Sequence, residues 1–402
     1  MAEKLIFCLL NNIAPHFTAF GAETMAEIDD RARLDLLPGW VSNPMSNSVL
    51  DVSSDGRYLI STGDAAPYLA VRDMQTGLNL SLSGWTYTAG GSRVAISPDG
   101  TKLAIARSSS PRLRVLNLSS GGAAFTIGTL PSYSLSCLAW SPDSTKLLVG
   151  NSNTLEAFGL RIYNAADWSF SNVTTSTPTV ISVAWKPDGT QFAAGYSSGT
   201  TVRVFNAADF TEPTIPVQPA FAVNHLAWSP DAAFIACGGL GAQITVLNAS
   251  TYAVAANVTP ATSGIRDMKW KPGTGKLYCV YDTGATRVTA IDSADWSQST
   301  PAGATTTHAL RGIVFSNTDM RRITTGTAQI LNDAGSPAAG RIVRMYDRTS
   351  GALIMSKTTD ASGQFLARYA SWGQVDLRVL DDDAGTTYND LTFARVTPAV
   401  AP

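Results

Sequence analysis

One pattern of apolar and polar positions recurs along most of the chain. Each unit has a short apolar run, a polar turn of the form Ser/Lys-Pro-Asp-Gly and a second apolar run, as in RVAISPDGTKLAIA from Arg93 and SVAWKPDGTQFAAG from Ser182. Proline presets φ and Asp-Gly allows a tight reversal, so each unit predicts a β-hairpin. The first run ends on a large apolar residue at a period of 42 to 45 residues: Val52, Ile96, Trp140, Trp185, Trp228, Trp270 and Phe315.

Two further strands are expected in each repeat. Runs such as RLRVLN (112–117) and VRVFNA (202–207) follow the hairpins and carry Asn at or next to their ends. A more polar segment then completes the unit, for example at residues 77–85 and 209–217. Four strands at this period indicate a propeller blade. The pattern therefore predicts an all-β fold built around a seven-bladed β-propeller, with six blades as the alternative.

The repeats resemble the WD-repeat propeller family over residues 30–320. The resemblance is carried by the Ser-Pro-Asp-Gly turn, the apolar strand after it, and the strand of the form Ile-Arg-Val-x-Asp/Asn that follows. The chain departs from the family because it lacks the Gly-His dipeptide and the terminal Trp-Asp, near which it has Asn117, Asn206, Asn248 and Asp292. The resemblance implies a propeller without the family's His network, nearer to divergent bacterial and viral members.

The pattern changes around Ile323, and residues 321–402 predict a separate domain. Short apolar strands alternate there with turns such as Asn-Asp-Ala-Gly and Asp-Ala-Ser-Gly, which is typical of a small antiparallel β-sandwich. The order of the segments resembles the carboxypeptidase-regulatory-like or transthyretin-like sandwich. Its ending, from Tyr388 to Pro398, resembles that of sandwiches at the C-terminus of tailed-bacteriophage virion proteins. The resemblance implies a rigid appendage.

The junctions between these parts leave alternatives open. Residues 1–29 are expected to form an N-terminal segment whose apolar run, Leu5–Leu10, is short for a secretory signal, and a start at Met25 would remove this run. Ile323–Thr327 fits either the second strand of the last blade or the first strand of the sandwich. A propeller ring commonly closes with a strand lent by the other terminus, and Ala32–Ser42 is the expected donor.

Charge and cysteine content narrow the range of partners. Twenty-nine basic and 31 acidic residues give a net charge of −2, and the longest basic run is the pair Arg321–Arg322, which disfavours nucleic acid. Charged residues make up only 15% of the chain, so we expect neutral, polar contact surfaces. No apolar stretch is long enough for a membrane span.

The chain has four widely spaced cysteines: Cys8, Cys137, Cys237 and Cys279. Their spacing predicts buried thiols rather than disulfides or a metal site, which is consistent with assembly in a reducing cytoplasm.

The sequence predicts no catalytic, cofactor-binding or metal-binding residue. None of His16, His225 and His308 lies in a metal or nucleophile motif, and His225 is interpreted as a structural strand residue. Asp381–Asp383 with Asp390 lacks the spaced pattern of a calcium loop, so a solvated turn is favoured. Five hairpin turns each carry one aspartate: Asp55, Asp99, Asp143, Asp188 and Asp231. Each carboxylate is interpreted as a hydrogen-bond acceptor for the backbone of its own turn and not as part of a ring of metal ligands.

The aromatic residues allow two interpretations. The periodic tryptophans Trp140, Trp185, Trp228 and Trp270 suggest a ligand cage, but one large residue at a fixed place in every blade is what packing between neighbouring sheets requires. The aromatic residues in the expected loops either contact a receptor or cover strand edges, and both interpretations stay open: Trp85, Tyr87, Tyr133, Trp168 and Trp296.

These features favour a binding protein over an enzyme. The resemblance of the C-terminal part implies a structural component of a phage tail or baseplate, made in the bacterial cytoplasm, located in the virion and arranged as identical copies around the tail axis. The alternatives are a host-surface receptor-binding module of the tail and a bacterial cell-surface or scaffold propeller. An enzyme of the lactonase or quinoprotein type is disfavoured because histidines and clustered carboxylates are scarce.

Overall fold

The structure is a computed structural model of the 402-residue chain. It describes residues 4–10, 17–21, 50–53, 57–62, 69–73, 80, 93–106, 112–118, 123–127, 135–152, 158–174, 179–198, 201–260, 264–281, 288–300, 310–319, 321–324, 342–347, 353–359, 361, 366–369, 375–379, 391–396 and 399–400. All regular secondary structure in these ranges is β-strand, and antiparallel pairing joins the strands into nine sheets. Among the described residues, none forms a helix of the length and hydropathy needed to cross a membrane.

Four sheets contain four strands that follow one another in sequence. They consist of β6 (Arg93–Ile96), β7 (Lys102–Ala106), β8 (Leu113–Asn117) and β9 (Ala123–Ile127); β10 (Leu135–Trp140), β11 (Lys146–Asn151), β12 (Leu160–Asn164) and β13 (Phe170–Thr174); β17 (His225–Trp228), β18 (Phe234–Gly238), β19 (Ile244–Asn248) and β20 (Val254–Val258); and β21 (Ile265–Trp270), β22 (Lys276–Tyr281), β23 (Val288–Asp292) and β24 (Gln298–Ser299).

Three further sheets each contain three strands in the part of the chain that is described. They consist of β3 (Leu50–Val52), β4 (Tyr58–Thr62) and β5 (Leu69–Asp73); β14 (Val180–Trp185), β15 (Gln191–Tyr196) and β16 (Val202–Asn206); and β25 (Leu310–Asp319), β1 (Lys4–Leu10) and β2 (Phe17–Gly21).

The repeated hairpins predicted from the sequence are present. In the unit from Arg93, β6 pairs with β7 in a register that sets Ile96 opposite Leu103. The turn is closed by hydrogen bonds from Ser97 N to Lys102 O (2.9 Å) and from Gly100 N to Ser97 O (2.8 Å). Gly100 adopts a φ of 68°, which a residue without a Cβ reaches at little cost. The Pro-Asp-Gly phrase therefore produces the reversal that was expected of it.

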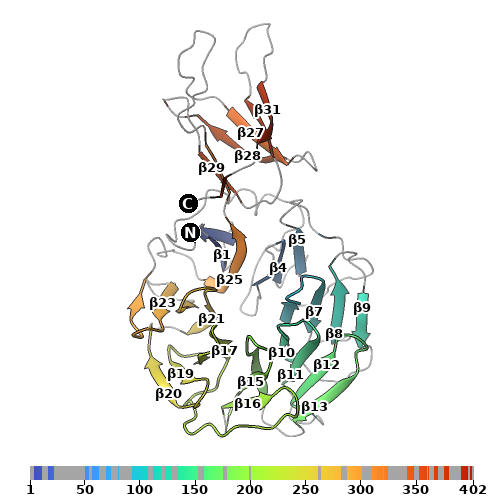
Figure 1. Ribbon diagram of the computed structural model, residues 1–402, viewed down its shortest axis with the longest axis vertical. Helices are drawn as coiled ribbons and strands as arrows, with labels where there is room; N and C mark the ends of the chain where they lie inside the picture. Colours follow the sequence, from blue (N-terminus) through green and yellow to red (C-terminus); the bar gives the residue numbers. More distant parts are fainter. Residues whose placement is uncertain are drawn as a thin grey trace.

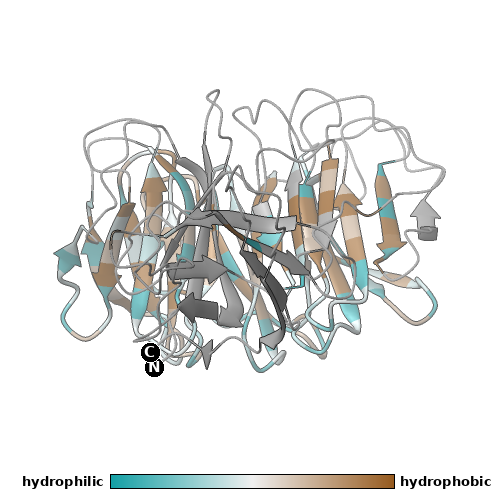
Figure 2. Ribbon diagram, turned by 90° about the horizontal axis from the view of Figure 1, so that it is seen from above, coloured by the Kyte–Doolittle hydropathy of each residue, from teal (hydrophilic) through white to brown (hydrophobic). Residues whose placement is uncertain are grey.

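These sheets lie side by side around a circle, as Figure 1 shows. One edge strand of each sheet packs beside an edge strand of the next, in the order β3, β6, β10, β14, β17, β21 and β25, and β25 packs beside β3. The core lies between neighbouring sheets: Val115 of β8 shares one buried cluster with Trp140 and Leu147 of the following sheet. Figure 2 shows the apolar positions concentrated on the strands and hydrophilic ones in the turns.

The predicted fourth strand at residues 209–217 is absent from the sheet β14–β16. Residues 207–224 are described throughout, and they contain no strand. This segment carries Pro213, Pro216 and Pro219. Proline has no backbone N–H to donate to a ladder and holds φ fixed, so three prolines spaced by three residues prevent regular pairing with β16.

The sheet that follows β24 differs from the predicted hairpin. The segment Arg321–Thr324 does not return along β25; β1 pairs with β25 instead, with Ile6 opposite Phe315 and Cys8 opposite Ile313. The residues after Phe315 are Ser-Asn-Thr-Asp, without the proline that stands two residues after each periodic residue from Ile96 to Trp270, and the strand continues to Asp319. The strand donated from the N-terminal region is therefore Lys4–Leu10; the expected donor, Ala32–Ser42, lies outside the described residues.

Two sheets remain in the C-terminal part of the chain. One has the order β29 (Leu366–Tyr369), β26 (Arg321–Thr324) and β32 (Ala399–Val400). The other has the order β28 (Leu353–Thr358), β27 (Ile342–Asp347), β30 (Val375–Val379) and β31 (Leu391–Val396). Of the two assignments open for the segment around Ile323, the described residues support the C-terminal one, because β26 pairs with β29 and β32.

Candidate interaction surfaces

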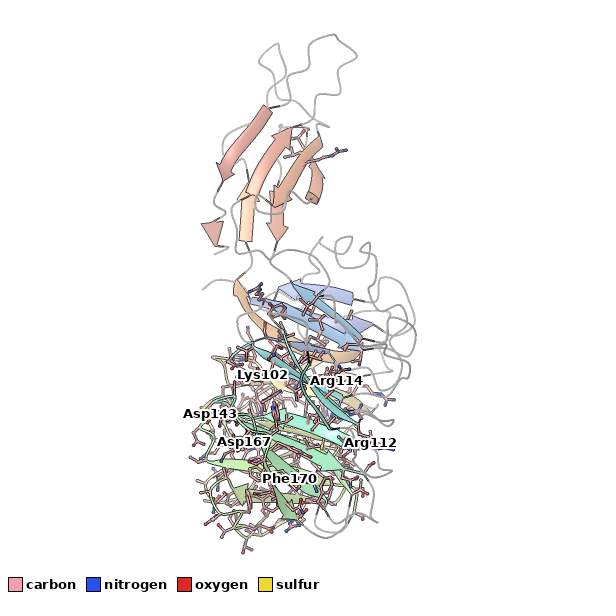
Figure 3. All side chains as sticks on the ribbon, turned by 90° about the vertical axis from the view of Figure 1, so that its right-hand side faces the viewer. Lys102, Arg112, Arg114, Asp143, Asp167 and Phe170 are labelled. Carbon is pink, nitrogen blue, oxygen red and sulfur yellow. The ribbon has the colours of Figure 1, made fainter. Side chains whose placement is uncertain are left out.

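The carboxylates of the hairpin turns accept hydrogen bonds from their own turns. Asp143 Oδ1 accepts hydrogen bonds from Ser141 Oγ (2.5 Å), Thr145 N (3.1 Å) and Thr145 Oγ1 (2.9 Å). Asp99, Asp188 and Asp231 accept the corresponding bond from the backbone N–H two residues on. This confirms the turn interpretation for the four described aspartates; Asp55 lies outside the described residues. In the edge-on view of Figure 3, Asp143 and Asp167, from two different turns, lie toward the same face of the ring.

Acid is expected to weaken the fold through these turns. Partial burial alone would raise the pKa of Asp188, but hydrogen bonds from Lys186 and Thr190 outweigh it and lower the pKa to about 2; the pKa of Asp143 is lowered in the same way. A carboxyl whose pKa is lower in the folded state contributes stability above its unfolded pKa of about 3.9 and loses it as pH falls. Urea unfolding at a series of pH values from about 5 down to about 2 should show falling midpoints, with a shallower fall for Asp143→Asn. A midpoint that does not change with pH in this range is incompatible with the turn bonds.

The periodic tryptophans join neighbouring sheets. The indole N–H groups of Trp140, Trp185 and Trp270 donate to the carbonyl oxygens of Ala95 (3.0 Å), Ala139 (3.1 Å) and Ala227 (3.1 Å), each in the preceding sheet. No more than 9% of any of these three tryptophans is exposed, and Trp228 is 7% exposed. The packing interpretation is confirmed, since buried indoles bonded to backbone do not form an open cage.

Aspartates connect two pairs of sheets where the periodic residue is not tryptophan. Asp51 accepts hydrogen bonds from Val52 N (3.0 Å) and from Ile96 N (2.8 Å) in the next sheet. Asp267 does the same for Met268 N (2.9 Å) and for Ile313 N (3.1 Å) of β25. Burial raises the pKa of Asp51, and Lys269 acts in the opposite direction. The sequence analysis missed both residues, because neither occupies a fixed position in the repeat.

The second set of turns places aromatic side chains in the core. Trp168, Phe210, Tyr252 and Trp296 have φ between 57° and 61°, which is costly for residues with a Cβ. Packing offsets this cost: the rings of Trp168 and Trp140 lie 6.2 Å apart, and those of Trp296 and Phe234 lie 5.0 Å apart. Trp168 and Trp296 are half-buried and packed against other rings, which supports the second interpretation, that they cover strand edges. Trp85, Tyr87 and Tyr133 lie outside the described residues.

The nucleophilic side chains that are described show no sign of activation. Cys137, Cys237 and Cys279 are buried free thiols, as predicted, and burial raises the pKa of Cys137 to about 11 and of Cys237 to about 12. Thiols of this kind are poor nucleophiles. His225 is half-buried at the start of β17, and burial lowers its pKa although Asp267 opposes the shift. This environment fits the structural interpretation of His225.

Clusters of metal-binding side chains are not found in the described ranges. His16, His308, Asp381–Asp383 and Asp390 all lie outside those ranges, as does the side chain of Cys8. The candidate calcium ligands therefore stay a sequence-based hypothesis.

Three large apolar side chains are exposed on the described surface. Phe170 on β13 is 54% exposed and lies over the guanidinium of Arg161, whose Cζ is 4.0 Å from the ring centroid. Val217 and Leu240 are 55% and 61% exposed, and both lie in coil segments next to β17 and β18. Single exposed apolar side chains are common on protein surfaces and do not by themselves mark a binding site.

Comparison with known proteins agrees with the repeat. Residues 170–206 match the family model described as WD domain, G-beta repeat. Among solved structures, the chain is similar to the beta-propeller domain of Cps50 (Swd1) from Myceliophteria thermophila, with a TM-score of 0.51 and 15% sequence identity over 66% of this chain and 87% of that chain. The ring is a WD-repeat-like β-propeller. No curated protein matches the sequence.

The comparisons fix the fold of the propeller and leave its partners open. At 15% identity, similarity to a solved structure speaks to architecture only. As many as 1768 chains of solved structures are similar, so the propeller does not select one function among them. Evidence for a particular function therefore has to come from the residues of this chain.

Proposed function

We propose that this protein is a non-enzymatic protein-interaction scaffold built on a seven-bladed propeller. The observation that carries the proposal is that one edge strand from each of seven sheets contacts the next in a closed order, from β3 through β25 and back to β3. A ring in which each sheet buries its faces against two neighbours is rigid and presents turns, loops and outer strands for binding. The periodic tryptophans and the cysteine thiols are buried, and burial raises the pKa values of Cys137 and Cys237. Contacts with partners are therefore expected at the surface of the ring.

The second part of the proposal concerns the C-terminal region. We infer that residues 321–402 form a β-sandwich appendage and that the protein is a structural component of a tailed-phage virion, in the tail or baseplate. Support comes from the sequence resemblance of the ending Tyr388–Pro398 and from the pairing of β26 to β32 within two sheets of their own. In this role the propeller is the docking platform, and identical copies repeat one interface around the tail axis.

Quantitative mass spectrometry of gradient-purified phage particles tests the virion role. The expected result is that peptides of this chain occur in a fixed integer ratio to the tail-tube protein, because a structural component repeats with the symmetry of the particle. Treating the particles with high salt before the gradient controls for chains that adhere to the surface. If the chain is missing from washed particles, the virion role is wrong, and the propeller is a scaffold elsewhere in the cell or at its surface.

A further inference from the structure

The sheet β14–β16 lacks a strand where its neighbours have one. In three of the four-stranded sheets, the residue two positions before the end of the third strand pairs with the fourth strand: Val115 with Phe125, Ile162 with Ser171, and Val246 with Ala256. The equivalent residue of β16 is Val204, which pairs with Ala193 of β15 on one side only. Residues 207–224, all of them described, contain no strand, so β16 is an edge strand in this part of the structure.

One backbone donor on this edge has no partner. The N–H groups of Val202 and Asn206 face the outer side, where they donate to Gln218 Oε1 (2.9 Å) and Thr211 O (2.9 Å). Backbone N–H groups alternate between the two sides of a strand, so the N–H of Val204 also faces outward. No hydrogen bond from the described residues reaches it, and Val204 is completely buried. A buried N–H without a partner is unfavourable, so the edge is incomplete at this position.

A proline explains why the following segment does not supply the partner. The turns after β12 and after β16 are each closed by a backbone hydrogen bond between residues five apart. By its distance from that turn, Pro213 therefore occupies the position opposite Val204 that Ser171 occupies opposite Ile162. Proline has no N–H to donate and holds φ fixed, so the chain does not continue here as a fourth strand.

Side chains hold the following segment against β16 in place of a ladder. We call this segment, residues 211–219, the edge strap; in Figure 1 the coil after β16 runs outside this strand along the rim of the ring. The Arg203 guanidinium pairs with both carboxylate oxygens of Glu212, and these side chains are 24% and 37% exposed. Thr201 Oγ1 holds the far end through a hydrogen bond to Pro219 O (2.9 Å). Ion pairs open to water contribute little to stability, so the attachment at Glu212 is weak.

The fourth strand of the sheet β10–β13 indicates which groups fit such an edge. Three consecutive residues of β13 contact β12 or the core: Ser171 opposite Ile162, Asn172, whose Oδ1 accepts a hydrogen bond from Arg161 Nε (2.9 Å), and Val173, which packs against a buried cluster. At the edge of β16, Arg203 is the equivalent of Arg161, and Ile215 of the edge strap packs against a buried cluster as Val173 does. A strand that fits this edge therefore carries a residue other than proline, then Asn, Asp or Glu, then an apolar residue.

We propose that the outer edge of β16 is a docking site for an extended segment of a partner protein, which displaces the edge strap and adds a fourth, antiparallel strand. The first residue of the three-residue pattern exchanges backbone hydrogen bonds with Val204. The second accepts a hydrogen bond from Arg203, and the third replaces Ile215 on the core. The inference rests on the proposed role as an interaction scaffold, names the kind of segment bound, and does not depend on the virion assignment.

Hydrogen exchange of single backbone amides, followed by NMR on the full chain, tests the proposal. Val246 is the reference for Val204, because it is equally buried but pairs with a fourth strand. The probe is the end-capped peptide SFSNVT, the sequence of residues 169–174, which carries the three-residue pattern. In the free chain we expect the Val204 amide to exchange about tenfold or more faster than that of Val246. Peptide at about 2 mM is expected to slow exchange at Val204 by about tenfold and to leave Val246 unchanged.

A control peptide and a variant of the edge strap sharpen the test. The peptide SFPNVT places proline opposite Val204 and is expected to leave exchange there unchanged. Gln218→Ala removes one attachment of the edge strap and is expected to strengthen binding of SFSNVT by about threefold or more, with thermal unfolding checking that the ring is intact.

Four results would overturn the proposal. They are equal exchange of Val204 and Val246 in the free chain, no protection by SFSNVT, equal protection by the two peptides, and weaker binding of SFSNVT to Gln218→Ala. None of them changes the closure of the ring or what mass spectrometry of particles would find. The docking proposal and the proposed function therefore fail independently.

Discussion

A chain that starts at Met25 is expected to lose on the order of 5 kcal/mol of folding free energy, because it lacks β1 and β2. β1 pairs with β25 through six register positions and with β2 on its other edge. Each ladder hydrogen bond contributes about 1 kcal/mol net. This loss equals the whole stability of many domains, so we expect a partly folded or aggregating product. Chemical denaturation followed by intrinsic fluorescence measures the change.

Deletion of residues 1–3 is the control for the deletion of residues 1–24. That shorter deletion leaves β1, which begins at Lys4, and is expected to keep the unfolding midpoint of the full chain. Equal midpoints for the full chain and the chain starting at Met25 would show that the ring does not depend on β1. Because β25 would then need another partner, such a result would favour Ala32–Ser42, the donor expected from the sequence, as the strand that pairs with β25.

Trp140→Ala is expected to lower the free energy of unfolding by about 4 kcal/mol, the usual range for truncating a buried tryptophan. The side chain is 6% exposed, belongs to the cluster between two sheets, and donates to Ala95 O at 3.0 Å. Truncation leaves a cavity at the joint and also an unpaired carbonyl. Urea unfolding monitored by circular dichroism gives the change without relying on the removed fluorophore.

The hydrogen bond can be separated from the packing by two conservative variants. Trp140→Phe keeps a large ring but removes the bond to Ala95, whereas Trp228→Phe removes an indole N–H that has no hydrogen-bond partner in the structure. We expect Trp140→Phe to cost about 1 kcal/mol more than Trp228→Phe. Costs that are equal, or a larger cost for Trp228→Phe, would mean that the bond across the joint contributes nothing to stability.

Local turn chemistry and a strict period made much of the ring predictable. The turns that begin with Ser-Pro or Lys-Pro predicted the hairpins. The periodic tryptophans identified the faces between sheets, because neighbouring sheets pack in the same way in each repeat. The same logic would have found the inward-facing Trp168 and Trp296, since they follow Asn164 and Asp292 by four residues with a backbone bond in each case. The sequence predicted both as loop residues that either contact a receptor or cover strand edges.

Other features depend on contacts between distant segments and had no local signal. Nothing within Lys4–Leu10 indicates β25 as its partner, because strand pairing across about 300 residues is set by which edge stays open. The missing fourth strand had a signal in Pro213, Pro216 and Pro219, which should have outweighed the repeat. Asp51 and Asp267 bond to neighbouring sheets from positions that differ between repeats, so periodicity could not reveal them.

An engineered disulfide tests most directly whether β1 completes the ring. Cys8 and Ile313 are Cα partners, and such pairs lie about 4.5 to 5.5 Å apart, within the range of a disulfide. Cys137, Cys237 and Cys279 are buried and do not compete. We expect mild oxidation to link the new cysteine of Ile313→Cys to Cys8 within one chain, as measured by mass spectrometry of peptides. In Val314→Cys, the next residue along, the new cysteine is expected to stay largely unlinked. Free thiols in Ile313→Cys, or equal linkage in both variants, would contradict the closure of the ring by β1.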